Sequence, residues 1–210
     1  MLKKVLKVTG ISLAIVFIVL LVSPFLFKNK IKELVLKSIN EKIDATVAFD
    51  DIQLSFIRNF PKANVTLEHL SVINKAPFEG DTLFYAGELQ LKMSIKELFK
   101  DEKEPLILES FYSKDGQVSV LFNADGVNNF DIALKEDKDS KDEESKPFAL
   151  HIQNYEIENW KFLYADESSK MKLQISDLNH KGSGDFAASK LDLNTFTTAN
   201  LSFEMDQVNY

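Results

Sequence analysis

The chain has 210 residues, a formal net charge of −7 and no cysteine. The acidic balance, with no basic cluster interleaved with aromatic residues beyond the N-terminal lysines, argues against a nucleic-acid partner. Without cysteine the chain offers neither disulfides nor thiolate metal ligands, and its 45% hydrophobic residues suffice for one sizeable domain or two small ones.

The first predicted element is a membrane anchor. Residues 8–27 contain no charged side chain, and lysines flank them on both sides. A helix of this length reaches about 30 Å, the thickness of the hydrocarbon core. A cleaved signal would have a shorter apolar core and a small-residue cleavage site. We therefore expect residues 1–30 to form an N-terminal tail and an uncleaved transmembrane helix, whose orientation the flanking lysines leave open.

Residues 31–44 predict a short amphipathic helix, because Ile31, Leu34, Val35, Ile39 and Ile43 recur at spacings of three and four. Two roles remain open for it. Its apolar side could cover the sheet that follows, or the helix could lie on lipid headgroups. In the second case each basic side chain would contribute about 1 kcal/mol on an anionic surface. The lysines assigned to that membrane surface are Lys28, Lys30, Lys32 and Lys37.

From residue 45 onward the apolar period becomes two, which predicts a mainly β fold. The clearest segment runs from Leu83 to Ile95, where one parity is apolar and the other polar. We expect about ten antiparallel strands in a curled meander, interrupted by one helical turn near residues 94–100. Breaks in the alternation at 50–51, 68–69 and 154 predict bulges or short turns.

Turn residues separate these strands in the sequence. Asp115-Gly116 and Asp125-Gly126 lie between alternating segments, where Asp-Gly pairs are strong hairpin signals, and Gly182-Ser183-Gly184 marks a third turn. Residues 135–147 are charged and polar throughout until Pro147, which predicts a flexible acidic insertion. The insertion separates a first β-sheet segment, residues 45–134, from a second one, residues 148–210.

The sequence beyond residue 45 contains no long helix that could cover an apolar sheet face. Two architectures therefore remain open: a closed sandwich with the apolar faces inward, or an open groove whose lining accepts an apolar ligand such as an acyl chain. In the second case the residues facing lipid would be Leu83, Tyr85, Leu89, Leu91, Met93, Val118, Val120 and Phe122. In a sandwich the same residues would be ordinary core.

No residue constellation argues for an enzyme, a cofactor or a metal. His69, His151 and His180 lie far apart without metal-ligand spacing, and Asp137, Asp139 and Asp142 lack the glycine of a calcium loop. No nucleophile elbow and no phosphate-binding glycine loop is present. We therefore expect a non-enzymatic protein.

Three stretches in order, residues 49–74, 81–99 and 125–134, follow the lysine-flanked anchor. The last contains Asp125, Gly126, Asn129 and Phe130. Together these features resemble the N-terminal domain of the AsmA family of Gram-negative envelope proteins. Phe130 stands where that family usually has tryptophan. Residues 157–179, which include Trp160, look like a recurring unit of the same family.

The resemblance implies an inner-membrane protein that spans the bilayer once and has its C-terminal domain in the periplasm. It implies a role in outer-membrane biogenesis and membrane protein targeting or assembly, with phospholipid held or passed along an apolar β-groove. Its partners would be the phospholipid bilayer, bound phospholipid and outer-membrane assembly proteins. The alternative is a closed β-sandwich that contacts envelope assembly proteins without lipid transport. The chain stops within a strand pattern, so we expect a fragment or a shortened family member.

Overall fold

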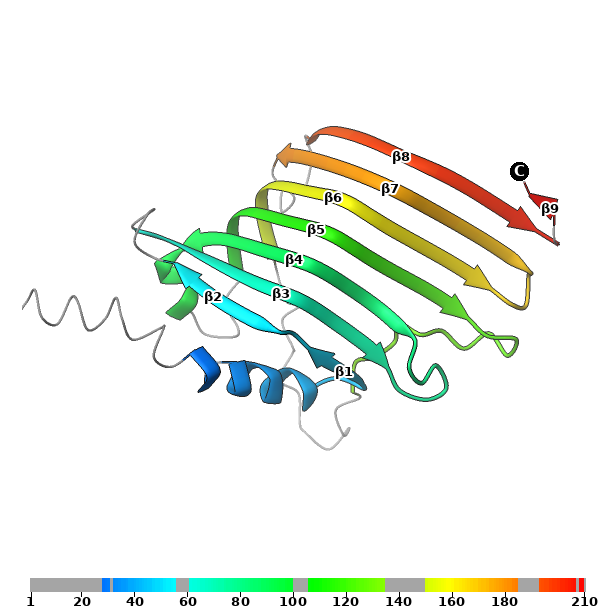
Figure 1. Ribbon diagram of the computed structural model, residues 1–210, viewed down its shortest axis with the longest axis horizontal. Helices are drawn as coiled ribbons and strands as arrows, with labels where there is room; N and C mark the ends of the chain where they lie inside the picture. The colour runs from blue at the N-terminus through cyan, green and yellow to red at the C-terminus, as the bar shows by residue number, and fades with distance from the viewer. Residues whose placement is uncertain are drawn as a thin grey trace, which may run out of the picture.

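The computed structural model describes residues 28–30, 32–55, 61–99, 106–134, 150–184, 193–206 and 208–209. Within them nine strands form one open sheet (Figure 1). The strands are β1 (Ala45–Ala48), β2 (Asp51–Ser55), β3 (Lys62–Asn74), β4 (Thr82–Ser94), β5 (Leu106–Phe122), β6 (Leu150–Asp166), β7 (Met171–Gly184), β8 (Leu193–Met205) and β9 (Val208–Asn209). Their order is β1-β3-β4-β5-β6-β7-β8-β9, and β2 pairs with β3 beyond the end of β1.

The predicted mainly β fold is confirmed, and so is the helical turn, which is the 3-10 helix η1 at Ile95–Phe99. The described residues form a single sheet and not a sandwich, so the closed-sandwich architecture is wrong. The predicted membrane anchor, residues 8–27, and the acidic insertion, residues 135–147, lie outside the described residues. Among those that are described, none belongs to a helix long and apolar enough to cross a bilayer.

The sheet differs from the predicted antiparallel meander at one pair of strands. β5 and β6 run parallel, in register from Leu106 opposite Leu150 to Phe122 opposite Asp166. Parallel neighbours need a crossover of a dozen or more residues, and residues 123–149 supply it. The two predicted sheet segments on either side of the acidic stretch therefore pair directly with each other.

Two of the predicted turns lie inside strands. Asp115-Gly116 falls within β5, and residues 182–184 end β7. At Gly116 and at Gly182 a glycine is required, because an aromatic ring of the neighbouring strand fills the place of a side chain. A β-carbon on Gly116 would lie 2.1 Å from Trp160 Cε2, and one on Gly182 would lie 2.5 Å from Tyr155 Cε1. The predicted turn at Asp125-Gly126 is confirmed, since the Gly126 amide donates to the Asn123 carbonyl across it.

A line of unusual backbone crosses the sheet. His69, Asp115, Asn159 and Asp177 have φ values between 50° and 53°, a left-handed conformation that His, Asn and Asp tolerate better than most side chains. They occupy one level of the sheet, with Gly87 of β4 lying between His69 and Asp115 in the pairing. We call these five residues the crease.

At the crease each strand changes which of its residues face the apolar cluster. In a given strand, even-numbered residues face it on one side of the crease and odd-numbered residues on the other. In β3 the partly buried Leu67 and Leu70 pack against the same apolar cluster although they differ by three positions. In β7 the less exposed residues are odd-numbered from 171 to 175 and even-numbered from 178 onward. The predicted break at 68–69 is this reversal at His69. The break expected at 154 occurs instead between Ile157 and Phe162, where the pairing of β6 with β7 shifts.

The amphipathic helix, described at residues 28–30 and 32–40, packs on one edge of the sheet beside β1 and β2 (Figure 1). Val35 and Leu36 pack against a buried cluster that consists of Phe49, Ile52, Ala63, Val65, Met93 and Leu108. Lys28 Nζ lies 2.5 Å from Asp51 Oδ1, and the Asn40 amide bonds to both backbone groups of Val47. The helix therefore covers the first end of the sheet.

Candidate functional site: the apolar face of the sheet

Rows of apolar side chains cross the sheet from strand to strand. Directly paired residues share a face. The longest row pairs residues from β3 to β8: Val72, Phe84, Val118, Phe162, Ile175 and Leu201. A second row lies two residues further along β5: Val120, Tyr164, Leu173 and Phe203. We call the side of the sheet that carries these rows the apolar face.

A second apolar cluster continues this face beyond the helix. Its buried members are Ala86, Leu89 and Trp160, and the half-buried residues around them are Leu67, Leu70, Phe84, Leu91, Phe111, Val118, Ile157 and Leu178. Leu67, Leu70 and Leu91 also pack against the first cluster, so the two clusters are continuous. Every member of the second cluster lies on strands β3 to β7 of the sheet itself.

The apolar face becomes more exposed toward the last strands. Phe84, Val118, Phe162 and Ile175 are only half-buried, and Leu201 at the end of the long row is 66% exposed. An isolated exposed leucine is ordinary, whereas a contiguous apolar surface points to a ligand, a membrane or a partner. Within the described residues the side chains that bury part of this surface belong to the sheet, to the N-terminal helix and, at Phe122, to Phe130 in the segment after β5, whose ring centroid lies 5.6 Å from that of Phe122.

The structure places most of the predicted lipid-facing residues on the apolar face. Leu89, Leu91 and Val118 belong to the second cluster and Met93 to the first. Val120 belongs to the second row, and the ring of Phe122 contacts Tyr164 with centroids 5.8 Å apart. Whether these residues contact lipid stays a prediction.

Tyr85 and Leu83 differ in position from the other predicted lipid-facing residues, and neither belongs to the apolar clusters. Tyr85 pairs with Ser71 and Gln117 and stacks on His69, with ring centroids 6.5 Å apart. It is next to Ala86 and therefore lies on the opposite face. The expectation that one parity of β4 faces one side is wrong, because the strand passes through the crease at Gly87. Leu83 is buried near a register shift at the start of β4 and belongs to neither cluster.

The four predicted membrane-surface lysines divide into two pairs. Lys28 binds Asp51, and its hydrogen bond holds the pKa of that carboxyl below its usual value. Lys32 donates to the Asp50 carbonyl and lies 5.5 Å from the centroid of the Phe49 ring. These two lysines fix the helix to the sheet.

Lys30 and Lys37 are the other pair, and their side chains are 67% and 71% exposed. Each lies near a glutamate of the helix itself, Glu33 at 3.7 Å and Glu41 at 3.8 Å. Exposed pairs of this kind contribute little. Lys30 and Lys37 therefore remain accessible to a membrane surface, and that role stays a prediction.

Polar groups interrupt the apolar face at a few positions to which the sequence assigned no role on that face. On the row beside Trp160, Tyr155 Oη bonds His180 Nε2, and His180 Nδ1 lies 2.6 Å from Thr197 Oγ1. Trp160 itself is buried, yet its Nε1 has no hydrogen-bond partner among the described residues. Two sequence features pointed to Trp160: it is the single tryptophan of the chain, and it lies in the segment that resembles a recurring AsmA unit.

The motif with Asp125 and Asn129 has a structural role in this chain. Asn129 is 2% exposed and lies beside β5 next to the start of β4, where the neighbouring Asn128 forms a bridge with Phe122. Its Oδ1 accepts from the Leu121 amide at 2.9 Å, and its Nδ2 donates to the Ser119 carbonyl at 2.8 Å. Asn74 donates to the Asn129 carbonyl at 2.6 Å. The motif thereby continues the sheet along β5 beyond the first residues of β4.

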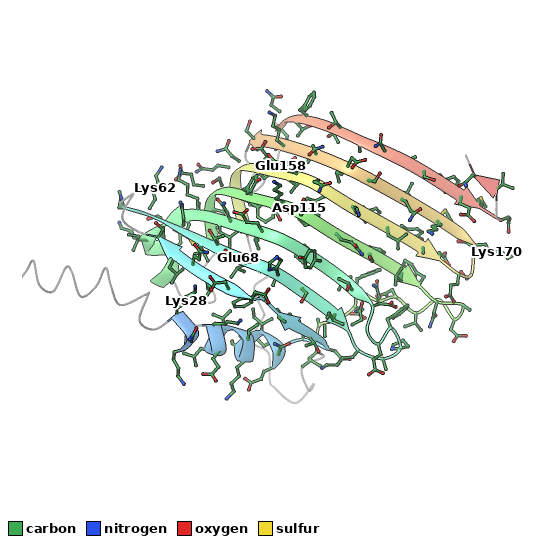
Figure 2. All side chains as sticks on the ribbon, viewed as in Figure 1. Lys28, Lys62, Glu68, Asp115, Glu158 and Lys170 are labelled. Carbon is green, nitrogen blue, oxygen red and sulfur yellow. The ribbon has the colours of Figure 1, made fainter. Side chains whose placement is uncertain are left out.

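These features define a class of structure, an open and mostly antiparallel sheet with one apolar face and an amphipathic helix at its first edge. Figure 2 shows the side chains along the strands, including Glu68, Asp115 and Glu158. No group of His, Asp or Glu side chains suited to a metal ion occurs in the described part of the chain. The sequence matches no protein-family model and none of the curated proteins.

Proposed function

We propose that the protein is a non-enzymatic, membrane-anchored member of the AsmA type that holds phospholipid acyl chains on the apolar face. The observation that carries the proposal is the apolar row from Val72 to Leu201, which runs over six paired strands. Burial of an acyl chain there would contribute about 0.8 kcal/mol for each methylene removed from water.

The predicted anchor and the AsmA resemblance support the location of this activity. They favour a protein that spans the inner membrane once, with the sheet in the periplasm and a role in outer-membrane biogenesis. Lys30 and Lys37 are exposed on the helix next to the anchor, where anionic headgroups would attract them. The sheet would then receive lipid close to the bilayer surface.

Site-specific photocrosslinking tests the proposal with a matched pair of positions. Phe162 pairs with Val118 and Ile175 on the apolar face, whereas its neighbour Leu163 pairs with Ser119 and Gln174 on the opposite face. Both side chains are half-buried. A photoreactive phenylalanine analogue at each position, in the full chain and in native membranes, supplies the probe.

We expect phospholipid adducts, detected by mass spectrometry, from position 162 and few from position 163. Equal labelling at both positions would mean that the apolar face is not the lipid-binding surface. Absence of adducts at both positions, together with no lipid retained by the purified full chain, would reject lipid binding altogether. A surface used only for protein contacts would instead give protein adducts at position 162.

A further inference from the structure

Among the described residues of the apolar face, the buried indole N–H of Trp160 has no hydrogen-bond partner. Trp160 is 7% exposed, and its Nε1 makes no hydrogen bond within the described part of the chain. A buried donor left unpaired costs about 1–3 kcal/mol. An acceptor delivered by a ligand would recover that cost, so the position is a candidate specificity site.

The surroundings of Trp160 select the kind of acceptor. Its ring lies over Gly116 and contacts Phe84, with ring centroids 5.5 Å apart, and Ala86 and Leu178 lie in the same cluster. A water molecule needs two to four polar partners to be stable in such a place, and this cluster is apolar. The acceptor that fits is one attached to a hydrocarbon chain.

The neighbouring rows differ in polarity on the two sides of Trp160. Toward Ile157 the row ends at His180 and Thr197, which bond each other. Toward Phe162 the row is apolar as far as Leu201. An ester group joins a polar headgroup region to an acyl chain, so its carbonyl belongs at this boundary.

We propose that Trp160 donates a hydrogen bond to the ester carbonyl of a glycerolipid acyl chain lying along the Phe162 row. Trp160 is thereby a specificity-determining residue that distinguishes ester-linked chains from ether-linked chains of the same length. The inference rests on the proposed function, since it requires the lipid on the apolar face. Because Nε1 is buried, side chains of the surrounding cluster must shift for the carbonyl to reach it.

The test uses the full chain held in amphipol and two probes that differ in one group. One probe is a short-chain diester phosphatidylcholine kept below its micelle concentration, and the other is the matched diether lipid. Calorimetry measures the two affinities. Since the chain has one tryptophan, a single indole N–H signal in a 15N-labelled sample reports on the hydrogen bond.

We expect the diester to bind about fivefold more tightly than the diether, the range of one neutral hydrogen bond. The indole signal should shift downfield with the diester only. Trp160→Phe retains an aromatic ring without the N–H, and it should bind both lipids with the weaker affinity.

Two outcomes overturn the inference while leaving the proposed function intact. One is equal affinity of the wild-type chain for diester and diether, and the other is a diester preference that survives in Trp160→Phe. If neither lipid binds the wild-type chain, the proposed function itself fails and the inference with it. The wild-type comparison needs no variant, so it decides the question even where Trp160→Phe folds poorly.

Discussion

Replacement of Gly116 by alanine tests the close approach between β5 and β6 on which the apolar face depends. The added β-carbon would lie 2.1 Å from Cε2, 2.3 Å from Cδ2 and 2.5 Å from Cζ2 of Trp160. Carbon atoms in contact are optimally about 3.5–4.0 Å apart. The indole must therefore move by more than about 1 Å, or the two strands must separate.

Overpacking of a well-packed site costs about 1–3 kcal/mol. We expect Gly116→Ala to lower the free energy of unfolding by about 2 kcal/mol, near the middle of that range. The assay is urea unfolding of the full chain in detergent, followed by the β-sheet circular dichroism signal. Tryptophan emission, which reports Trp160 alone, should move to longer wavelength in the folded variant as the indole becomes more exposed.

A double-mutant cycle isolates the contact. In a Trp160→Ala background the ring is gone, so Gly116→Ala should cost nothing, and the coupling energy should equal about 2 kcal/mol. Gly87→Ala is the control in the crease, since its β-carbon would meet Asp115 Cβ at 3.2 Å, a much milder contact. An equal loss of stability from Gly116→Ala with and without Trp160 would refute the reasoning.

Three further changes test other parts of the structure by urea unfolding. Asn129→Ala leaves the Leu121 amide and the Ser119 carbonyl without their partner, so the free energy of unfolding should fall by about 2–3 kcal/mol. The control is Asn194→Ala at an exposed position, which should have little effect. Leu36→Ala should cost about 1–2 kcal/mol, since this side chain of the helix is partly buried against the sheet. No loss of stability would mean that the helix does not cover the sheet. Burial, and then the hydrogen bond to Glu158, raises the pKa of Tyr112 to about 12 from 10.0. As the pH rises, the unfolded chain therefore loses this proton before the folded chain does. The free energy of unfolding should fall between about pH 10 and 12 in the wild type, and less so in Tyr112→Phe. Parallel plots of stability against pH for the two proteins would contradict this.

The period-two pattern predicted the strands but not the crease. A single left-handed residue appears in the sequence only as a break in alternation, and a break is equally consistent with a turn or a bulge. At His69 the break lay where the structure places the reversal. In β4 the reversal occurs at Gly87 within a segment that reads as one clean parity from Leu83 to Ile95. Tyr85 was consequently assigned to the wrong face.

Asp115-Gly116 shows why local turn chemistry misled the prediction. An Asp-Gly pair indicates that the backbone can adopt positive φ and that one position carries no side chain. Asp115 does have a φ of 53°, and Gly116 does lack a side chain for a reason, the Trp160 ring. Whether the chain reverses there depends on which strands pair, and β5 pairs along its length with β4 and β6.

The surroundings of Trp160 could not be predicted from the sequence, because they depend on how the strands pair. Its environment combines Gly116, Phe84 and Leu178, which come from three other strands, and the parallel pairing of β5 with β6 brings the first of them under the ring. The sequence favoured an antiparallel order because its alternating segments are separated by short turn signals. The acidic crossover has no periodic pattern, so nothing in it indicates the direction of the next strand.

The crease determines how far the apolar face extends. β5 has 17 residues and spans about 56 Å at about 3.3 Å per residue. Without the reversal at Asp115, Phe111 and Val118 would lie on opposite faces, and each face would be apolar over only about half of that length. With it, both belong to one cluster with Trp160.

The side chains that hold the crease point away from that cluster, and Asn159 Nδ2 donates to Asp115 Oδ1 at 2.5 Å on an exposed surface. The continuity of the proposed lipid-binding surface therefore depends on polar residues that never touch it. A β-branched residue at Asn159, which disfavours positive φ, should interrupt lipid contact on the apolar face without changing any apolar side chain.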